Sequence, residues 1–316
     1  MTEYGYALSS EEHAPDDLVR YAQQAEATGF SFAAISDHFH PWVDQQGHAP
    51  FVWSVLGAIS HATTNLKLGT GVTCPTVRIH PAIIAQAAAT VAAMMPGRFF
   101  LGVGSGENLN EHILGDHWPP APVRQDMLGE AVAVIRQLWE GGYQSFDGAY
   151  YTVENARIYT LPEEPPPIIM AAGGPAAATL AGATADGLWT VAPEAELIEK
   201  FTEAGGSGPK YGQVTACWAP DEDAAKKTAY EWWPNAGIGG ELSQELPLPR
   251  HFEQAAKLVT PEDLAEKLPL GPDPDRHLEA IKAYVDAGYD HVYIHQIGPD
   301  QDGFFDFFTR ELAPRL

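Results

Sequence analysis

Polar residues that could do chemistry are concentrated in residues 36–42, which read Ser-Asp-His-Phe-His-Pro-Trp. Asp37, His38, His40 and Trp42 offer groups that titrate, donate hydrogen bonds or stack, which is more than a connecting turn requires. Because a histidine titrates close to neutral pH, this loop could remove a proton from a substrate. The pattern therefore predicts a catalytic loop. The alternative is that Asp37 caps a turn and that both histidines are solvated.

Two further glycine-rich stretches could bring the backbone close to a ligand. Residues 69–76 read Gly-Thr-Gly-Val-Thr-Cys-Pro-Thr and residues 102–107 read Gly-Val-Gly-Ser-Gly-Glu. The second stretch lacks the G-x-G-x-x-G spacing of a dinucleotide fingerprint, and we reject a Rossmann interpretation. Glu107 and Asn110 are better candidates for an acid and a positioning group that face a pocket. Alternatively, the first stretch is a tight turn and Glu107 is a surface carboxylate.

Residues 173–176, Gly-Gly-Pro-Ala, lie between a predicted buried strand and a predicted helix. Free backbone N–H groups and the positive end of a helix dipole favour a phosphate at such a position. Proline at the first helical position fits the same arrangement. The alternative is a plain strand-to-helix turn. Elsewhere, Trp232 and Trp233 could form an apolar wall of a substrate pocket, whereas the aromatic residues of 304–308 are expected in the core.

Strands and helices alternate along the chain. Apolar runs and their boundaries predict strands at residues 3–8, 30–37, 66–73, 98–103, 167–172, 186–191, 211–219 and 291–296. Helical spacing predicts helices at residues 15–28, 51–61, 81–95, 123–139, 175–184, 194–203, 276–287 and 303–312. The rhythm is interrupted by a predicted hairpin at residues 143–160 and by a long irregular segment at residues 220–270.

Eight such units predict an α/β fold, a (β/α)8 TIM barrel, with insertions after helix 4 and after strand 7. The chemical residues follow strands two to six, and a barrel gathers all of these loops at one face, whereas an open sheet would spread them out. We find no linker and no repeat of fixed period. The sequence therefore predicts a single domain over residues 1–316.

Composition restricts the partners and the compartment. The 316 residues include 18 Lys and Arg against 42 Asp and Glu, which gives a net charge of -24 and argues against nucleic acid or anionic membranes as partners. An anionic ligand would need backbone donors or a few basic side chains. Cys74 and Cys217 are too few for a disulfide framework, and no signal peptide or membrane span is recognisable. We expect a soluble, cytoplasmic protein.

Several motifs together resemble those of a known family. They are residues 36–42 with Gly47-His-Ala-Pro50, residues 68–76, residues 81–86, residues 100–111, residues 171–176 and the ending around residues 311–316. In this order they are similar to the F420-dependent glucose-6-phosphate dehydrogenase family, part of the luciferase-like group of flavin and deazaflavin barrels. The resemblance implies a (β/α)8 barrel, a homodimer, and coenzyme F420, a deazaflavin that accepts a hydride at ring carbon C5.

The resemblance also implies roles for single residues. His38 would be the general base for the alcohol proton, Glu107 would protonate N1 of the reduced ring, and Trp42 would steady the reacting centre. The residues implied to hold the cofactor are Asp37, Gly71, Val72, Thr73, Asn110, Gly173, Gly174, Pro175, Ala176 and Thr190. Within this set, residues 173–176 would bind its phosphate.

The chain departs from the family pattern where a sugar phosphate would bind. The lysine expected after strand six is absent from Thr190-Val-Ala-Pro-Glu194, and residues 236–249 contain no Lys or Arg. Lys267 is the basic position that remains, and Glu194 and Glu196 are expected at the pocket rim. We therefore predict an uncharged alcohol or sugar as substrate, bound by Trp42, Lys267 and Trp232.

Three other functions are open from the sequence. The first is an FMN-dependent luciferase-like monooxygenase. The second is a metal-dependent barrel hydrolase, in which His38-Phe-His40 and the later His291 and His295 would bind the metal. The third is a barrel that binds the cofactor without catalysis. Because no complete set of metal ligands is recognisable, we predict no metal site.

Overall fold

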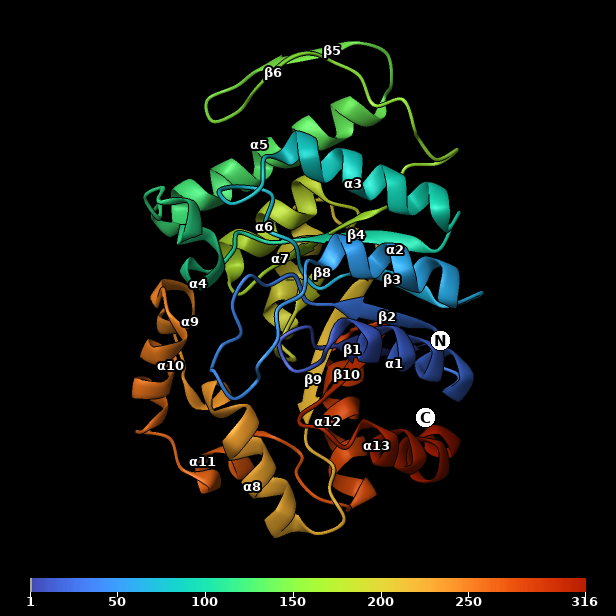
Figure 1. Ribbon diagram of the computed structural model, residues 1–316, viewed down its shortest axis with the longest axis vertical. Helices are drawn as coiled ribbons and strands as arrows, with labels where there is room; N and C mark the ends of the chain where they lie inside the picture. Colours follow the sequence, from blue (N-terminus) through green and yellow to red (C-terminus); the bar gives the residue numbers. More distant parts are fainter. Residues whose placement is uncertain (1) are drawn as a thin grey trace.

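The computed structural model describes residues 2–316, and eight parallel strands close into a barrel at its centre (Figure 1). The strands are β1 (Glu3–Leu8), β2 (Phe32–Ile35), β3 (Lys67–Thr70), β4 (Phe99–Val103), β7 (Ile168–Ala171), β8 (Gly187–Thr190), β9 (Lys210–Ala216) and β10 (His291–Gln296). Around the barrel their order is β1-β10-β9-β8-β7-β4-β3-β2. The predicted (β/α)8 TIM barrel is therefore confirmed.

A helix follows each barrel strand and covers the outside of the sheet. These helices are α1 (Pro15–Thr28), α2 (Val52–Ala62), α3 (Pro81–Met94), α5 (Ala121–Trp139), α6 (Pro175–Thr184), α7 (Ala195–Glu203), α12 (Pro274–Ala287) and α13 (Gln301–Phe307). Most predicted boundaries lie within two residues of the observed ones. The strands predicted at residues 66–73 and 211–219 end three residues beyond β3 and β9. The helix predicted at residues 303–312 ends as an α-helix at Phe307 and continues as a π-turn (η3, Phe308–Leu312) and a 3-10 turn (η4, Ala313–Arg315).

The barrel interior is filled by aromatic rings instead of a pore. Phe32, Phe100, Trp189, Tyr211 and Tyr293 form its buried cluster together with small aliphatic residues. Space for two of the rings comes from glycines on neighbouring strands, because a Cβ atom at Gly5 would overlap the ring of Phe32 and one at Gly69 would overlap that of Phe100. This plug leaves the carboxyl ends of the strands as the place where a ligand can enter.

Two insertions interrupt the alternation, at the predicted places. The hairpin β5 (Gln144–Asp147) and β6 (Thr152–Ala156) follows α5 and lies outside it in Figure 1. After β9 the chain forms α8 (Glu222–Trp232), η2 (Pro234–Gly237), α9 (Leu242–Glu245), α10 (Pro249–Ala256) and α11 (Pro261–Lys267). A short helix after β4, α4 (Asn108–Glu111), and the turn η1 (His112–Leu114) were not predicted. α9 packs against α4, where the Asn108 amide donates to the Glu245 carbonyl over 2.9 Å.

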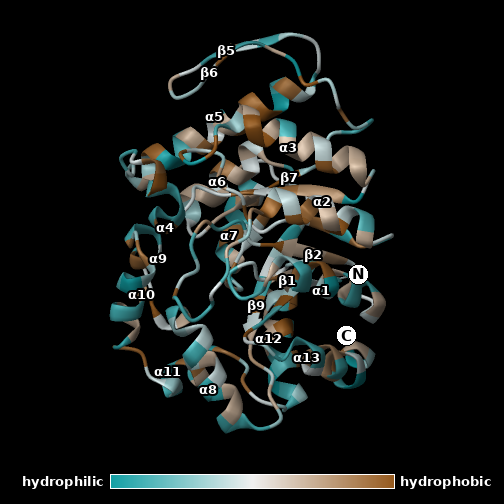
Figure 2. Ribbon diagram, in the orientation of Figure 1, coloured by the Kyte–Doolittle hydropathy of each residue, from teal (hydrophilic) through white to brown (hydrophobic). Residues whose placement is uncertain are grey.

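Hydropathy follows the layers of the fold. Figure 2 shows apolar colouring on the strands and on α3, and hydrophilic colouring on much of α8, α10 and α11. Among residues 2–316, no helix combines the length and the apolar character needed to cross a bilayer.

Candidate active site

The carboxyl ends of the strands surround a cavity of about 830 Å³. Its wall includes residues from the loops after β1, β2, β3, β4, β7 and β8 and from the second insertion. A smaller polar compartment of about 110 Å³ shares Val72, Glu107 and Gly173 with it. The loops that carry the predicted site residues are therefore brought together at one end of the barrel.

His38 lies on the cavity wall with both ring nitrogens engaged. Its Nε2 is 3.2 Å from Glu11 Oε1, and its Nδ1 is 3.1 Å from the His40 carbonyl oxygen. The Asn110 amide nitrogen is 3.2 Å from the same Nδ1. Glu11 can accept a hydrogen bond from Nε2–H, and Nδ1 can accept one from the Asn110 amide. The ring is thereby held in place from both sides.

Glu11 is a functional candidate that the sequence did not reveal. It is 2% exposed and accepts hydrogen bonds from the hydroxyls of Ser9 and Ser36. Burial opposes its ionisation, but the charge of His38 and the Ser36 hydroxyl outweigh burial and keep the pKa of Glu11 below its ordinary value. The sequence feature that could have indicated Glu11 is its position in the loop after the first strand, at the catalytic face of a barrel. In the structure the polar residues Ser9 to His13 of this loop are all buried.

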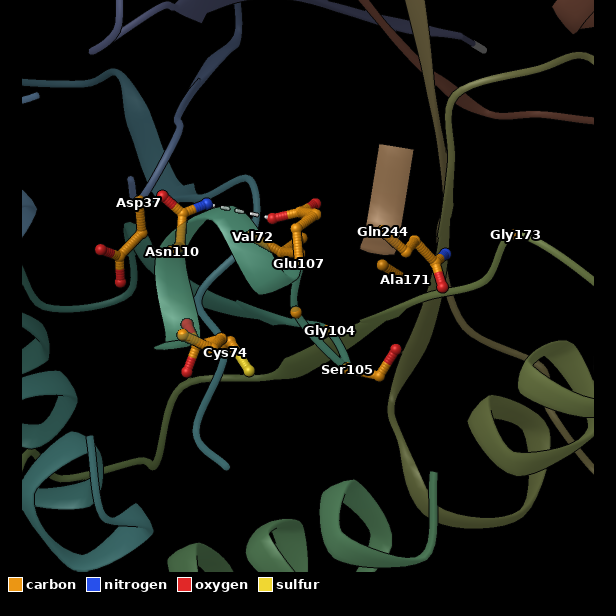
Figure 3. Close-up of a pocket in the computed structure, with 12 residues that line it drawn as sticks. Asp37, Val72, Cys74, Gly104, Ser105, Glu107, Asn110, Ala171, Gly173 and Gln244 are labelled. Carbon is orange, nitrogen blue, oxygen red and sulfur yellow. Dashed lines mark hydrogen bonds between the residues drawn. The ribbon is translucent and has the colours of Figure 1, made fainter. Parts of the chain in front are cut away.

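Glu107 and Asn110 are joined by the short helix α4. Asn110 lies on this helix and Glu107 at its N-cap, and Figure 3 shows the Asn110 amide donating to Glu107 Oε2, over 3.2 Å. The Asn110 carbonyl oxygen accepts the backbone N–H groups of Phe39, at 2.9 Å, and His40, at 3.2 Å. Asn110 thereby ties the histidine loop to the carboxylate that faces the cavity.

Asp37 points into a buried network of charges beside the smaller compartment. Its carboxylate accepts the Thr73 hydroxyl over 2.8 Å and lies 2.9 Å from an Arg78 nitrogen. Arg78 also contacts Glu111, by its Nε at 3.4 Å and by its backbone N–H at 2.7 Å. Thr73 is fully buried, so in the structure it supports Asp37 and does not line the cavity.

Glu111 carries the largest pKa change among the carboxylates of this network. Burial, only partly offset by the Arg78 charge, raises the pKa of Glu111 to about 7. Since this value lies above the ordinary 4.5, folded protein binds more protons than unfolded chain between pH 4.5 and 7. As the pH rises from 4.5 to 7, we therefore expect Glu111 to lower the free energy of unfolding by about 3 kcal/mol.

Urea unfolding at pH 5 and at pH 7.5 would measure this effect. The variant Glu111→Gln should lose the decrease of about 3 kcal/mol that Glu111 contributes, and the matched variant Glu266→Gln, at an exposed carboxylate, should retain it. Equal pH dependence in Glu111→Gln and in the natural protein would contradict the expectation.

The glycine turn before α6 is open, as a phosphate site requires. Gly173 lines both cavities, and a Cβ atom built on Gly173 or Gly174 would meet no other atom within 4 Å. Pro175 occupies the first helical position, and both Pro175 and Ala176 are exposed. The first backbone N–H groups of α6 are therefore accessible to an anion.

Three other predicted contacts also lie on the cavity wall. Gly71 and Val72 line it at the end of β3. Thr190 lines it at the end of β8, where its hydroxyl donates to the Ala192 carbonyl over 2.9 Å. The ring of Trp42 lies 5.1 Å from that of His38 between ring centroids, and it also contacts the ring of Phe252.

On the substrate side, Lys267 lines the cavity as predicted, but the predicted Trp232 does not. Trp233 lines it instead, because consecutive residues at a helix end point about 100° apart. Both rings also pack against the apolar cluster of the second insertion. Glu194 and Glu196 are likewise absent from the lining. The wall after β8 consists of residues 190–193, and Glu196 lies in the first turn of α7.

Histidine and carboxylate side chains do not assemble into a metal site. Within residues 2–316, no group of three or more His, Cys, Asp or Glu is placed to bind an ion. His291 pairs with Asp290 at 2.6 Å, and His295 pairs with Glu12 at 2.8 Å. Of the histidines considered for a metal-dependent hydrolase, His38, His291 and His295 are thus in separate carboxylate pairs, and His40 contacts a backbone carbonyl.

Comparisons with known proteins show the family to which the chain belongs. The family model described as luciferase-like monooxygenase matches residues 1–291. F420-dependent glucose-6-phosphate dehydrogenases from Microbacterium testaceum and Mycobacterium tuberculosis are each 39% identical to the chain, over 99% of it and 97% of their own length. A solved F420-dependent secondary alcohol dehydrogenase, in complex with an F420-acetone adduct, is 32% identical, with a TM-score of 0.91 over 98% of both chains. The resemblance found in the loop motifs is confirmed, and the chain belongs to the luciferase-like family, in its group of F420-dependent dehydrogenases.

Proposed function

We propose that this protein is an F420-dependent oxidoreductase that transfers a hydride between an uncharged alcohol or sugar and C5 of the deazaflavin. The observation that carries the proposal is the pairing of two proton-handling groups on one cavity. The His38–Glu11 pair and the Glu107 carboxylate both line it, and Asn110 connects them. Names of similar proteins, an F420-dependent secondary alcohol dehydrogenase among them, support the same cofactor and reaction type.

The chain's own residues fit the cofactor. Bound F420 would supply the hydride acceptor, while the protein binds and orients it. The open turn at Gly173 and Gly174 and the exposed N-terminus of α6 would hold its phosphate. Gly71, Val72 and Thr190 would line the ring, and Asp37, fixed by Thr73 and Arg78, would contact it from the smaller compartment.

His38 would accept the hydroxyl proton of the alcohol. Glu11, which is buried and accepts hydrogen bonds from Ser9 and Ser36, would then stabilise the imidazolium that forms. Glu107 would hold the proton needed at N1 of the ring, and Trp42, packed beside His38, would keep the reacting carbon in place. The whole chain would act as one barrel domain in this scheme.

The nature of the lining favours an uncharged substrate. Among the described residues, Lys267 is the Lys or Arg side chain on the wall of the large cavity, whereas Glu11 and Glu107 contribute carboxylates to it.

Absorbance of oxidised F420 during incubation with a panel of secondary alcohols and sugars tests the proposal. Bleaching by an alcohol supports it. Oxygen uptake with reduced FMN, together with no bleaching by any alcohol, would instead indicate a monooxygenase.

Glu107→Gln should lower the rate of hydride transfer by about 10²-fold while leaving F420 affinity within a few-fold. The amide is nearly isosteric and can keep the contact with Asn110, but it cannot supply a proton. Single-turnover absorbance measurements across pH would separate the proton step from binding. A pH–rate profile identical to that of the natural protein would remove Glu107 from the acid role.

A further inference from the structure

Gln244, in the short helix α9, is a cavity residue that the proposed mechanism does not use. The two compartments of the site share Val72, Glu107, Ala171, Gly173 and Gln244 in their walls. Figure 3 shows the Gln244 side chain close to Ala171 and Gly173, on the opposite side of the smaller compartment from Asp37. Because this compartment measures only about 110 Å³, one ligand group that enters it comes within reach of opposite walls. The second insertion thus brings an amide group to the place where the two compartments meet.

Arg124 fixes the orientation of this amide. Arg124 lies in the first turns of α5, is fully buried, and places a terminal guanidinium nitrogen 2.9 Å from Gln244 Oε1. A guanidinium has donors only, so the atom that it contacts is the amide oxygen, and the amide nitrogen points in another direction. The guanidinium is held in turn by the Pro119 carbonyl at 2.7 Å, by Glu245 Oε1 at 3.2 Å and by the ring of Trp118, 4.3 Å away.

The amide nitrogen of Gln244 is a donor left for a ligand. It makes no hydrogen bond to any group of residues 2–316, and it is not one of the buried atoms that lack a partner. The nitrogen is therefore accessible. Arg124 lines neither compartment, so its positive charge lies behind Gln244 as seen from a ligand. Since linked hydrogen bonds polarise one another, the arginine strengthens the amide as a donor.

The smaller compartment has an acidic side and a side with neutral donors. Its carboxylates are those of Asp37, Glu107 and Glu111, and no Lys or Arg of the described chain lines it. Gln244 and the open glycine turn at Gly173 lie away from Asp37 in Figure 3. An anion is repelled by ionised carboxylates and attracted by N–H donors. A phosphate therefore fits beside Gly173, where the Gln244 amide nitrogen is available to it.

We propose that Gln244, oriented by Arg124, donates a hydrogen bond to the phosphate of bound F420, so that the second insertion takes part in holding the cofactor. This inference rests on the proposed F420-dependent function. A hydrogen bond to an anion is stronger than one between neutral groups. In a chain of net charge -24, the amide brings the influence of the Arg124 charge to the phosphate without direct contact between the two.

Binding of F420 and of its phosphate-free fragment, the deazaflavin ring with the ribityl chain alone, tests this contact. Both Kd values are measured on the whole protein by fluorescence titration, without alcohol. In Gln244→Leu, the Kd of F420 should rise about 10- to 100-fold, the usual effect of losing a hydrogen bond to a charged group. The Kd of the fragment should stay within a few-fold, because the fragment carries no phosphate.

Gln244→Glu separates the donor from the packing of α9. The carboxylate offers Arg124 an oxygen in place of the amide oxygen, so Tm should not fall, yet F420 affinity should drop at least as far as in Gln244→Leu. If Arg124 acts through Gln244, Arg124→Lys should weaken F420 binding on its own and add little in the Gln244→Leu background. The matched control is Glu241→Gln, at the exposed N-cap of α9 and outside both linings, which should leave both Kd values unchanged.

The outcomes separate this contact from the proposed function. Unchanged F420 affinity in both Gln244 variants, or an equal loss of affinity for F420 and the fragment, would overturn the phosphate contact and leave alcohol oxidation intact. If the natural protein binds F420 but oxidises no alcohol, the proposed function fails, and the Kd values still decide the role of Gln244. If it binds no F420, both are overturned.

Discussion

Replacing His38 by alanine is expected to lower kcat for alcohol-dependent F420 reduction by about 10² to 10⁴-fold, the usual contribution of a general base. In the proposed mechanism the His38 imidazole on the cavity wall accepts the hydroxyl proton, and Glu11, at 3.2 Å, stabilises the charge that forms. Its removal leaves water or the Glu11 carboxylate as poorer acceptors. Stopped-flow absorbance of the deazaflavin, at saturating cofactor and alcohol, measures the effect.

The control for this experiment is His40→Ala in the same loop. The Nδ1 of His40 is 2.8 Å from the Leu109 carbonyl oxygen, and the side chain does not line the cavity. We expect this variant to keep turnover within about tenfold, because only a loop contact is lost. F420 affinity should change little in either variant. Near-normal turnover in His38→Ala would show that another group takes the proton.

The second large effect concerns phosphorylated substrates. Glucose 6-phosphate is expected to be used far less efficiently than an uncharged alcohol or sugar, although similar proteins carry the name glucose-6-phosphate dehydrogenase. A phosphate dianion must exchange its hydration for several charge-assisted hydrogen bonds. The absence of two basic contacts, at roughly 1.5–3 kcal/mol each, corresponds to about 10² to 10⁴ in affinity.

The positions of the basic residues support this expectation. Lys267 lines the cavity, but it is exposed and its Nζ lies 3.4 Å from the Gly237 carbonyl oxygen. Arg276 is committed elsewhere, because it donates to the carbonyls of Ala265 and Leu270 and pairs with Glu222. Arg250, in the first turn of α10, is exposed and lies outside the cavity lining.

Specificity constants for glucose and glucose 6-phosphate at equal F420 saturation test the prediction. The variant Val191→Lys tests the same argument by adding a positive charge to the cavity wall, because Val191 is 68% exposed and lines the cavity after β8. It should raise the efficiency with glucose 6-phosphate and leave that with glucose nearly unchanged. A clear preference of the natural protein for the sugar phosphate would mean that the second insertion brings a basic group to the substrate on binding.

Local sequence determined the architecture and the loops that carry the chemistry. Apolar runs and helix boundaries depend on neighbouring residues, so the alternation that defines the barrel is visible without tertiary contacts. Once a barrel is expected, its topology places residues 36–42, 69–76 and 102–107 at one face. The open turn at Gly173 was predictable for the same reason, since its glycines and the following proline describe one local geometry.

Tertiary structure alone decided which side chains form pairs. Glu11 lies 27 positions before His38 in the chain. In the sequence, Glu11 and Glu12 resemble residues of a solvated turn, and only the structure shows that their loop meets the loop of His38. The four-residue helix α4, which orients Glu107, is too short for a periodic signal. Which of Trp232 and Trp233 faces the cavity depends on the rotation of a helix end. Pairing across the barrel is set by packing between segments far apart in the chain, and sequence spacing does not encode such distances.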